Sequence, residues 1–242
     1  MAVCTLATVE HTTNASPRTP GAFTPAANDL LVCVWAATGM SDGFEGTASC
    51  TSTGNTASWD QVDFVDFTTA GNQGKMFCFI QTALCAGVST AVTVGNTADE
   101  ASGNHVWVYA VSGMTKVGTL AKLQKCEDNE HAAGIPAATA FGAACLTTNP
   151  VLSFIHDEDT VGNAPQTAPV GWTLPTSPAS EGYILTPTSR GVSAFINSGF
   201  TGTAITWQVT GTGIYGHYGI ELDASGGGAP PKLWTPTSPR RW

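Results

Sequence analysis

Charged residues and long apolar runs are both scarce in this sequence. Charged side chains make up only 11% of the 242 residues, against roughly a quarter in a typical domain. No apolar run reaches the ~20 residues of a membrane-spanning helix, and the first residues lack the basic and apolar regions of a secretory signal. We therefore expect no membrane partner and folding in a cytoplasm. With 18 Asp and Glu against 9 Lys and Arg, the balance also argues against nucleic-acid binding.

The seven cysteines lack the spacing of a metal or disulfide framework. Their number is odd and no Cys-x-x-Cys pair occurs, which fits neither a disulfide-stabilised domain nor a zinc site. Cys4, Cys33, Cys78 and Cys145 lie in apolar, strand-like runs, where a reduced thiol is a small buried apolar group. A disulfide between Cys78 and Cys85 in an oxidising medium remains an open alternative.

Strand patterns dominate the chain, separated by clusters of Gly, Asn, Thr, Pro and Ser. Ten or more short antiparallel strands predict an all-β protein, a β-sandwich or jelly roll. Two of the runs, Asp29–Ala36 and His105–Ser112, are apolar on both faces, as in central strands covered on both sides. The expected strands are Asp29–Ala36, Ser58–Phe67, Lys75–Thr82, Thr90–Val94, His105–Ser112, Val151–His156, Tyr183–Thr186, Val192–Asn197, Ala204–Thr210 and Gly216–Asp223.

One β-domain is expected over residues 1–224. Its weakest stretch is Gly113–Thr148, where Thr119–Glu130 predicts a helical turn or a long loop. This stretch is the candidate subdivision between two halves. The halves show no strict repeat, but each has a long apolar strand, a turn, a tryptophan-bearing strand and another apolar strand, in that order.

The last eighteen residues, 225–242, differ from the rest of the chain and form a predicted C-terminal arm. Three glycines make a hinge, and the following proline-rich run favours an extended conformation. The arm carries +3 and the whole chain −9, so residues 1–224 carry −12. Tryptophans on such an arm are natural anchors in a partner's pocket, although a frayed terminus is the alternative. The predicted partner-binding residues are Lys232, Trp234, Arg240, Arg241 and Trp242.

The sequence motifs provide little evidence for a catalytic, metal or cofactor site. The glycines of Gly211–Gly216 match the spacing of a dinucleotide loop, but a strand rather than a helix follows, so we interpret them as a hairpin turn. The acidic residues Asp157–Asp159 at a strand end suggest a solvated turn, with calcium binding or acid–base chemistry as alternatives. The patch Glu127–His131, next to Cys126, has no second pair of zinc ligands. We predict no catalytic residue, no metal and no cofactor.

The tryptophans inside strands, Trp35, Trp107 and Trp207, are expected in the core. Trp59 and Trp172 lie at strand edges. Packing is the simpler interpretation for both, and a sugar-stacking surface is the alternative.

The strand sequences together resemble a known group of proteins. NDLLVCVWAATG, KMFCFIQTAL, STAVTVG, HVWVYAVSGM, NPVLSFIH, PVGWTLP and TAITWQVTGTGIYGHYGIELDA follow one another over roughly residues 25–223. In this order they are similar to the β-sandwich modules of tailed-bacteriophage virions: head decoration (cement) proteins, head fibres and tail modules. The cysteine count and the acidic segment Asp157–Asp159 depart from that pattern.

The resemblance implies a virion structural protein, assembled in the host cytoplasm, without enzymatic activity or cofactor. Its expected partners are the major capsid protein, other virion proteins and further copies of itself, with a trimer as one arrangement. A low-charge surface fits this role because it gives little repulsion between copies. The alternatives are a tail or fibre module that binds host glycans, and a hydrolase using the carboxylates of Asp157–Asp159.

Overall fold

The computed structural model describes residues 1–12, 17–38, 48–69, 72–95, 103–115, 122–128, 139–161, 166–175, 183–184, 189–209 and 212–224. These ranges contain strands and turns but no helix, and therefore none that could cross a membrane. The strands form antiparallel sheets, so the all-β prediction and the β-sandwich are confirmed.

The first main sheet is built from the N-terminal half of the chain. Its order is β1-β7-β2-β5-β4. Val, Leu, Ile, Phe and Trp dominate the central strands, which suits a pleated surface that is buried on both faces. The bounds are Val3–Thr12 for β1, Leu30–Thr38 for β2, Trp59–Thr69 for β4, Asn72–Gln81 for β5 and Gly103–Ser112 for β7.

The second main sheet is built from the C-terminal half, in the order β12-β13-β10-β16-β8. Its central strand β10 pairs with β13 on one side and with β16 on the other. The bounds are Lys122–Asp128 for β8, Val151–Val161 for β10, Tyr183–Ile184 for β12, Ser189–Ile196 for β13 and Thr212–Leu222 for β16.

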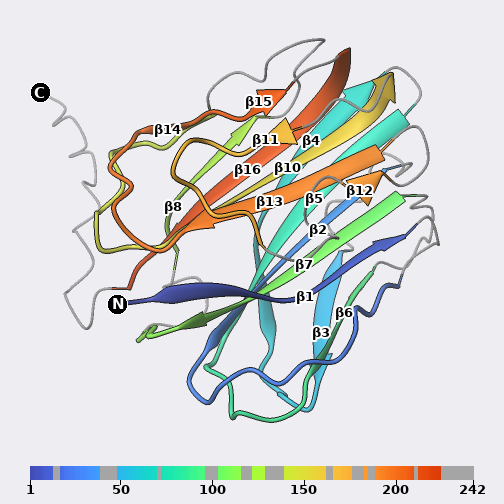
Figure 1. Cartoon of the computed structure of the whole chain (residues 1–242). Coiled ribbons are helices and arrows are strands. Elements are labelled where there is room, and N and C mark those ends of the chain that lie inside the picture. Colours follow the sequence, from blue (N-terminus) through green and yellow to red (C-terminus); the bar gives the residue numbers. More distant parts are fainter. Residues whose placement is uncertain are drawn as a thin grey trace, which may run out of the picture.

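Three small two-stranded sheets complete the strands: β3 (Ser49–Thr53) with β6 (Ala91–Gly95), β9 (Thr139–Ala140) with β14 (Ala204–Ile205), and β11 (Gln166–Thr167) with β15 (Gln208–Val209). The segment from Arg18 to Phe23 adds to β6 through bridges at Val94 and Thr90. Figure 1 shows β3 and β6 on one outer side of the two main sheets, and β11, β14 and β15 on the other.

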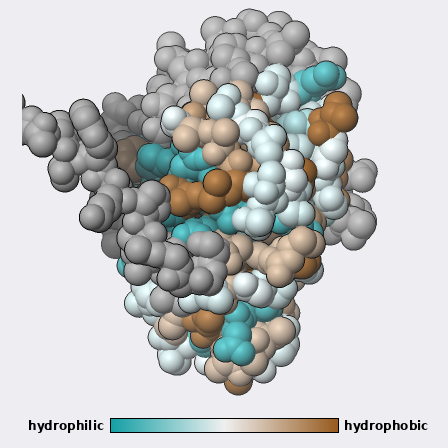
Figure 2. Space-filling view, turned by 90° about the vertical axis from the view of Figure 1, so that its left-hand side faces the viewer, coloured by the Kyte–Doolittle hydropathy of each residue, from teal (hydrophilic) through white to brown (hydrophobic). Residues whose placement is uncertain are grey.

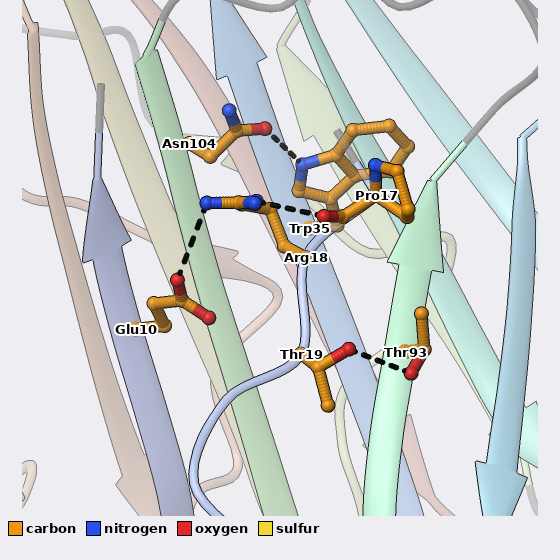
Figure 3. A network of polar contacts seen from close by, with 7 residues as sticks. All are labelled: Glu10, Pro17, Arg18, Thr19, Trp35, Thr93 and Asn104. Atoms are coloured by element: carbon orange, nitrogen blue, oxygen red, sulfur yellow. Dashed lines mark hydrogen bonds and ion pairs between the residues drawn. The ribbon is translucent and has the colours of Figure 1, made fainter. Parts of the chain in front are cut away.

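The segment that carries Arg18 is fixed by polar contacts at the sheet margin (Figure 3). The Arg18 guanidinium lies 3.7 Å from Glu10 Oε1, and its Nε donates to the Pro17 carbonyl. Thr19 hydrogen bonds Thr93 on β6. Below this segment the Trp35 indole donates to Asn104 Oδ1 over 2.7 Å. These bonds anchor the covering segment to β1 and to β6.

The same pairing order occurs twice along the chain. In the first half the outermost strands in sequence, β1 and β7, pair with each other. Inside them in sequence, Phe23 pairs with Thr90, and inside these β2 pairs with β5, so each pair encloses the next. In the second half β8 pairs with β16, β9 with β14, and β10 with β13 in the same nested way. A short sequence likeness accompanies the equivalence: TAVTV at 90–94 and TAITW at 203–207 occupy corresponding positions. The two halves therefore repeat one topology.

Three apolar layers follow from this arrangement. The middle layer, which we call the inter-sheet core, joins the two main sheets and includes Leu30, Val32 and Val34 of β2 with Leu152 and Phe154 of β10. The outer layer of the first half includes Cys33, Trp35, Phe77, Val92 and Val106. The outer layer of the second half includes Cys126, Ile155, Val192, Ile205 and Trp207. Alternate residues of β2 thus face different layers, which confirms that this strand is covered on both sides.

The predictions for residues 122–128 and for the motif at 211–216 were wrong. Lys122–Asp128 is the strand β8, where a helical turn or loop was expected: its polar side chains suit an edge strand, and pairing with β16 outweighs the weak local pattern. The motif Gly211–Gly216 is not a hairpin turn, because Gly213 and Gly216 lie within β16; Gly211 is outside the described residues. The expected strand Ala204–Thr210 is split into β14 and β15, with Ile205 and Trp207 buried as its alternation predicted.

Candidate functional site

All five predicted partner-binding residues, Lys232, Trp234, Arg240, Arg241 and Trp242, lie outside the described residues, and their role stays a prediction. The structure describes the residues just before the predicted arm. The Leu222 amide donates to the Pro150 carbonyl (3.0 Å), and the Ala224 amide to Asn149 Oδ1 (3.2 Å). The other chain end is fixed nearby in the fold, since the Cys4 amide donates to Asn197 Oδ1 over 2.7 Å. Figure 1 shows the start of β1 and the end of β16 on the same side of the body.

The acidic segment Asp157–Asp159 belongs to a strand. Its backbone continues β10, in which Asp157 pairs with Arg190 and with Tyr215. The interpretation as a solvated turn was therefore wrong, because β10 extends five residues past His156, to Val161. The side chains of this segment are outside the description, and calcium binding stays an untested alternative.

Only part of the second acidic patch, Glu127–His131, lies within the described residues. Cys126 is buried in β8, the backbone of residues 127–128 continues that strand, and Glu130 and His131 lie outside the described residues. Among the residues that the structure does describe, no group of three His, Cys, Asp or Glu side chains is placed to hold a metal ion.

A histidine cluster lies at one end of the inter-sheet core, and it was not predicted from the sequence. His11 of β1, His105 of β7 and His156 of β10 bring their rings together: the centroids are 4.7 Å apart for His11 and His105 and 4.9 Å apart for His105 and His156. The Nδ1 atoms of His11 and His105 are 2.6 Å apart. His105 and His156 have no exposed surface, and His11 is half-buried. The Trp107 ring stacks on His105 at 5.8 Å.

A second polar group, centred on His217, lies inside the second half. His217 Nε2 is 2.8 Å from Ser153 Oγ, and its Nδ1 is 2.5 Å from Thr139 Oγ1. The Trp207 indole donates to the same Ser153 oxygen over 2.9 Å. Burial lowers the pKa of His217 to about 3, so the ring is neutral near pH 7. A serine beside a neutral histidine resembles a nucleophile with its base, but all of these residues are buried and substrate cannot reach them.

The Glu221 carboxylate is also fully buried and serves the fold. Its Oε1 accepts from the Leu146 amide (2.7 Å) and from Asn149 Nδ2 (2.9 Å), and its Oε2 accepts from Gln124 Nε2 (2.6 Å). A buried carboxylate needs such donors, because an uncompensated charge in the interior is costly. Glu221 thereby joins β8 and the segment before β10 to β16.

All seven cysteines are free. Burial raises the pKa of Cys78 to about 12 and that of Cys85 to about 11, so both thiols stay protonated. Cys78 lies in the inter-sheet core, whereas Cys85 lies in a separate small cluster with Leu31. The prediction of buried, reduced thiols is thus confirmed for Cys4, Cys33, Cys78 and Cys145.

The edge tryptophans are packed against the body. Trp59 is half-buried against the outer layer of the first half, and its Nε1 donates to Ser52 Oγ over 3.2 Å. Trp172 is half-buried against the other outer layer and meets the Phe200 ring edge-on at 5.3 Å. Packing against the body is thus confirmed for both rings, and sugar stacking stays an untested alternative.

Large apolar side chains are exposed at five of the described positions: Met1, Val3, Val88, Leu146 and Val170. Figure 2 shows one face, where pale residues of near-neutral hydropathy predominate and brown areas are small. The most exposed apolar side chain is Val170 (99%), at the tip of a turn closed by a bond from the Trp172 amide to the Pro169 carbonyl. A groove of about 260 Å³ runs between β1 and the segment after this turn, lined by Cys4, Thr5, Leu6, Thr173, Leu174, Pro175 and Phe195.

Comparison with known proteins does not place the chain in a family. No protein family matches the sequence, and no curated protein does. A solved structure titled "Red Clover Necrotic Mosaic Virus" aligns with 96% of this chain and with 99% of the length of its own chain. The sequence identity is 8% and the TM-score is 0.24. A TM-score this low does not establish a common fold.

Proposed function

We propose that this chain is a non-enzymatic structural protein of a virus particle, a capsid decoration or cement subunit of a tailed bacteriophage. The proposal is supported first by the body, a sandwich whose central strands are covered on both faces and in which few residues are charged. Because only 11% of the residues are charged, few charged side chains have to meet when copies lie side by side. The partners we propose are the major capsid protein, other virion proteins and further copies of this chain, with a trimer as one arrangement.

The observation that carries the proposal is the doubled strand order. In each half the first strand pairs with the last, which gives β1 with β7 and β8 with β16. The third strand pairs with the sixth, which gives β2 with β5 and β10 with β13. This is the pairing of a long hairpin that is folded over on itself. Each half has eight strands if the Arg18–Phe23 segment is counted as a strand of the first half and β14 and β15 are counted as one strand of the second half. Eight strands wound in this way are a jelly roll, a fold used by capsid and lectin domains. We therefore propose two jelly rolls packed back to back.

The arm supplies the means of attachment. From Ala229 to Trp242 the sequence offers fourteen residues, which at ~3.1 Å each in an extended conformation span about 40 Å. Such a reach crosses from one subunit to the next. Its +3 charge complements an acidic neighbour, and two tryptophans provide apolar anchors. Weak binding by each copy suffices when many copies bind the same shell.

The absence of enzymatic activity is part of the proposal. The serine, histidines and cysteines that could act as nucleophile or base in the described part of the chain are mostly buried. The glycan-binding alternative is less well supported, because the rings of Trp59 and Trp172 are half-buried and packed on the body.

The experiment is incorporation into particles. Full-length chain and three variants are supplied during assembly: a deletion of residues 225–242, Trp234→Ala/Trp242→Ala, and Thr235→Ala/Thr237→Ala as the matched control in the same arm. We expect loss of occupancy for the deletion, reduction by about tenfold or more for the tryptophan pair, and full occupancy for the control. Undiminished occupancy of the deletion variant would contradict the role of the arm, and absence of the full-length chain from particles would contradict the function.

A further inference from the structure

The groove described above lies between the margins of the two main sheets. One wall is β1, the edge strand of the first sheet. The other wall is the segment 173–175, which is joined to β13 of the second sheet by the bridge between Thr173 and Phe195. Phe195 belongs to the inter-sheet core, and Leu6 of β1 packs against that core. The groove therefore reaches the apolar layer that joins the two halves.

The groove has room for a side chain with two fused rings. Its volume is about 260 Å³, whereas an apolar cavity of roughly 150 Å³ holds one benzene ring. Leu6, Leu174 and Phe195 supply apolar lining, and the Phe195 ring already meets the Tyr109 ring edge-on at 5.9 Å. A further ring placed against Phe195 would extend this aromatic contact. An aromatic side chain is therefore the chemistry that fits.

Tryptophan fits the groove better than phenylalanine because the lining includes hydroxyl groups. Thr5 and Thr173 both line the groove, and both are exposed, which places them at its mouth. A threonine hydroxyl can accept a hydrogen bond from an indole N–H. A tryptophan can thus bury its rings against the apolar lining while its N–H meets a polar group at the surface.

The predicted arm begins at the same end of the second sheet as the groove. Val151 of β10 pairs with Ile196, the last residue of β13, and with Glu221, near the end of β16. The ends of β13 and β16 are therefore level. They are about 10 Å apart, which is twice the spacing of neighbouring strands.

Hydrogen bonds fix the chain on both sides of this gap. Ala224, the last residue before the arm, packs against the inter-sheet core, and its amide donates to Asn149 Oδ1 over 3.2 Å. Cys4 lines the groove, and its amide donates to Asn197 Oδ1, directly after β13. The start of the arm and the groove thus have fixed positions close to each other.

The arm is long enough to reach the groove of its own chain. Nine residues, 225–233, separate Ala224 from Trp234, and an extended chain of this length covers roughly 30 Å. The three glycines 226–228 permit the chain to turn back. A short flexible connection gives an effective concentration in the millimolar range, which in dilute solution far exceeds the concentration of arms from other copies.

We propose that the groove between β1 and the segment 173–175 binds Trp234 of the chain's own arm in the free protein. Trp234 suits it better than Trp242, because it is next to apolar Leu233 and closes the shorter loop. Docking covers an apolar anchor that would otherwise promote association between copies. This docked state does not rest on the proposed function, although attachment to a neighbouring subunit would require release of the arm from the groove.

Cleavage of the folded full-length chain by trypsin tests the docking. The bond after Lys232 lies two residues before Trp234, and the bonds after Arg240 and Arg241 serve as a comparison within the same arm. Each rate is followed by mass spectrometry and divided by the rate for a synthetic peptide of residues 225–242 with the same sequence. If Trp234 is docked for about four fifths of the time, cleavage after Lys232 is about fivefold slower than in the peptide, because trypsin cuts the released arm. Cleavage after Arg240 and Arg241 should keep the peptide rate.

Variants of the arm identify the residue that docks. Trp234→Ala should bring cleavage after Lys232 to the rate of its own peptide, because the group that fills the groove is lost. Trp242→Ala is the matched control in the same arm and should leave the fivefold protection unchanged.

Variants of the body identify the groove. Leu174→Lys should remove the protection, because a charged ammonium does not share a buried site with an indole. Val170→Lys is the matched control, since Val170 is 99% exposed on the preceding turn, and it should retain the protection. Should Leu174→Lys fail to fold, nuclear Overhauser contacts from the Trp234 ring to the methyl groups of Leu6 and Leu174 in the unaltered protein replace it, and their presence supports the proposal.

Equal relative rates of cleavage after Lys232 and after Arg240 would overturn the proposal. So would protection that persists in Trp234→Ala or in folded Leu174→Lys, or the absence of the Overhauser contacts. Protection that decreases when the protein is diluted tenfold would overturn docking within one chain and indicate the arm of a second copy. Since every measurement uses the free protein, a negative result leaves the proposed attachment to particles untouched.

Discussion

A methyl group added at Gly191 should disturb the contact between the two halves. In Gly191→Ala the new Cβ would lie 2.8 Å from two ring atoms of His105 and 2.8 Å from Trp107 Cη2, closer than real Cβ contacts come. Both neighbours are rings fixed in a packed interior, so relief requires a shift of β13 or of the rings. Overpacking of this kind costs about 1–3 kcal/mol, which lowers the melting temperature of a chain of this size by roughly 2–12 °C.

The matched control is Gly142→Ala. Its Cβ would meet nothing within 4 Å, so its melting temperature should stay within about 1–2 °C of the parent protein. Both variants are compared by near-ultraviolet circular dichroism during heating, which reports packing of aromatic rings. Equal melting temperatures for the Gly191 variant and the control would refute the close packing of the histidine cluster, as would a Gly191 variant more stable than the parent.

Three further predictions concern buried groups. His156 and His217 each have a folded-state pKa of about 3, below the ordinary value of ~6.5, so the unfolded chain binds more protons as the pH falls from 6.5 towards 3. Their contribution to stability is complete above pH 6.5 and is lost on acidification, by about 2 kcal/mol for each histidine at pH 5. Urea unfolding at pH 7.5 and at pH 5.0 measures this loss. Equal free energies of unfolding at the two pH values would contradict it. Ser153→Ala should lower the free energy of unfolding by about 3 kcal/mol, since His217 and Trp207 lose a buried partner, whereas Ser49→Ala on the exposed part of β3 should change it by less than about 0.5 kcal/mol. A thiol reagent should modify at most one cysteine in the folded protein, half-buried Cys50, and all seven after unfolding; rapid modification of Cys78 in the folded state would show that the inter-sheet core is accessible.

The central strands could be predicted from the sequence because their successive residues are buried alternately in two apolar layers. In β2, Val32 and Val34 face the inter-sheet core while Cys33 and Trp35 face the outer layer, which produces the continuous apolar run that identified the strand. The edge strand β8 has no such pattern. Only its pairing with β16, almost a hundred residues later, defines it, and local propensity carries no information about that pairing.

The histidine cluster was not predictable for the same reason. His11 and His105 are separated by 94 residues, and their meeting depends on the register of β1 against β7, in which they are directly opposed. His156 joins them only through the packing of one sheet on the other. The doubled topology was equally hidden, because a common strand order tolerates almost complete divergence of side chains. The arm residues remain predictions from composition alone.

The central claim is that a pair of packed β-folds is fixed to a virus shell by its C-terminal arm. The most direct measurement is cryo-electron microscopy of particles assembled with the full-length chain and with the chain lacking residues 225–242. The account predicts ordered copies on the shell in a constant number per capsid subunit, with arm density that contacts a neighbouring subunit, and bare shells for the truncated chain. Particles without density for this protein, or equal occupancy by both chains, would contradict it.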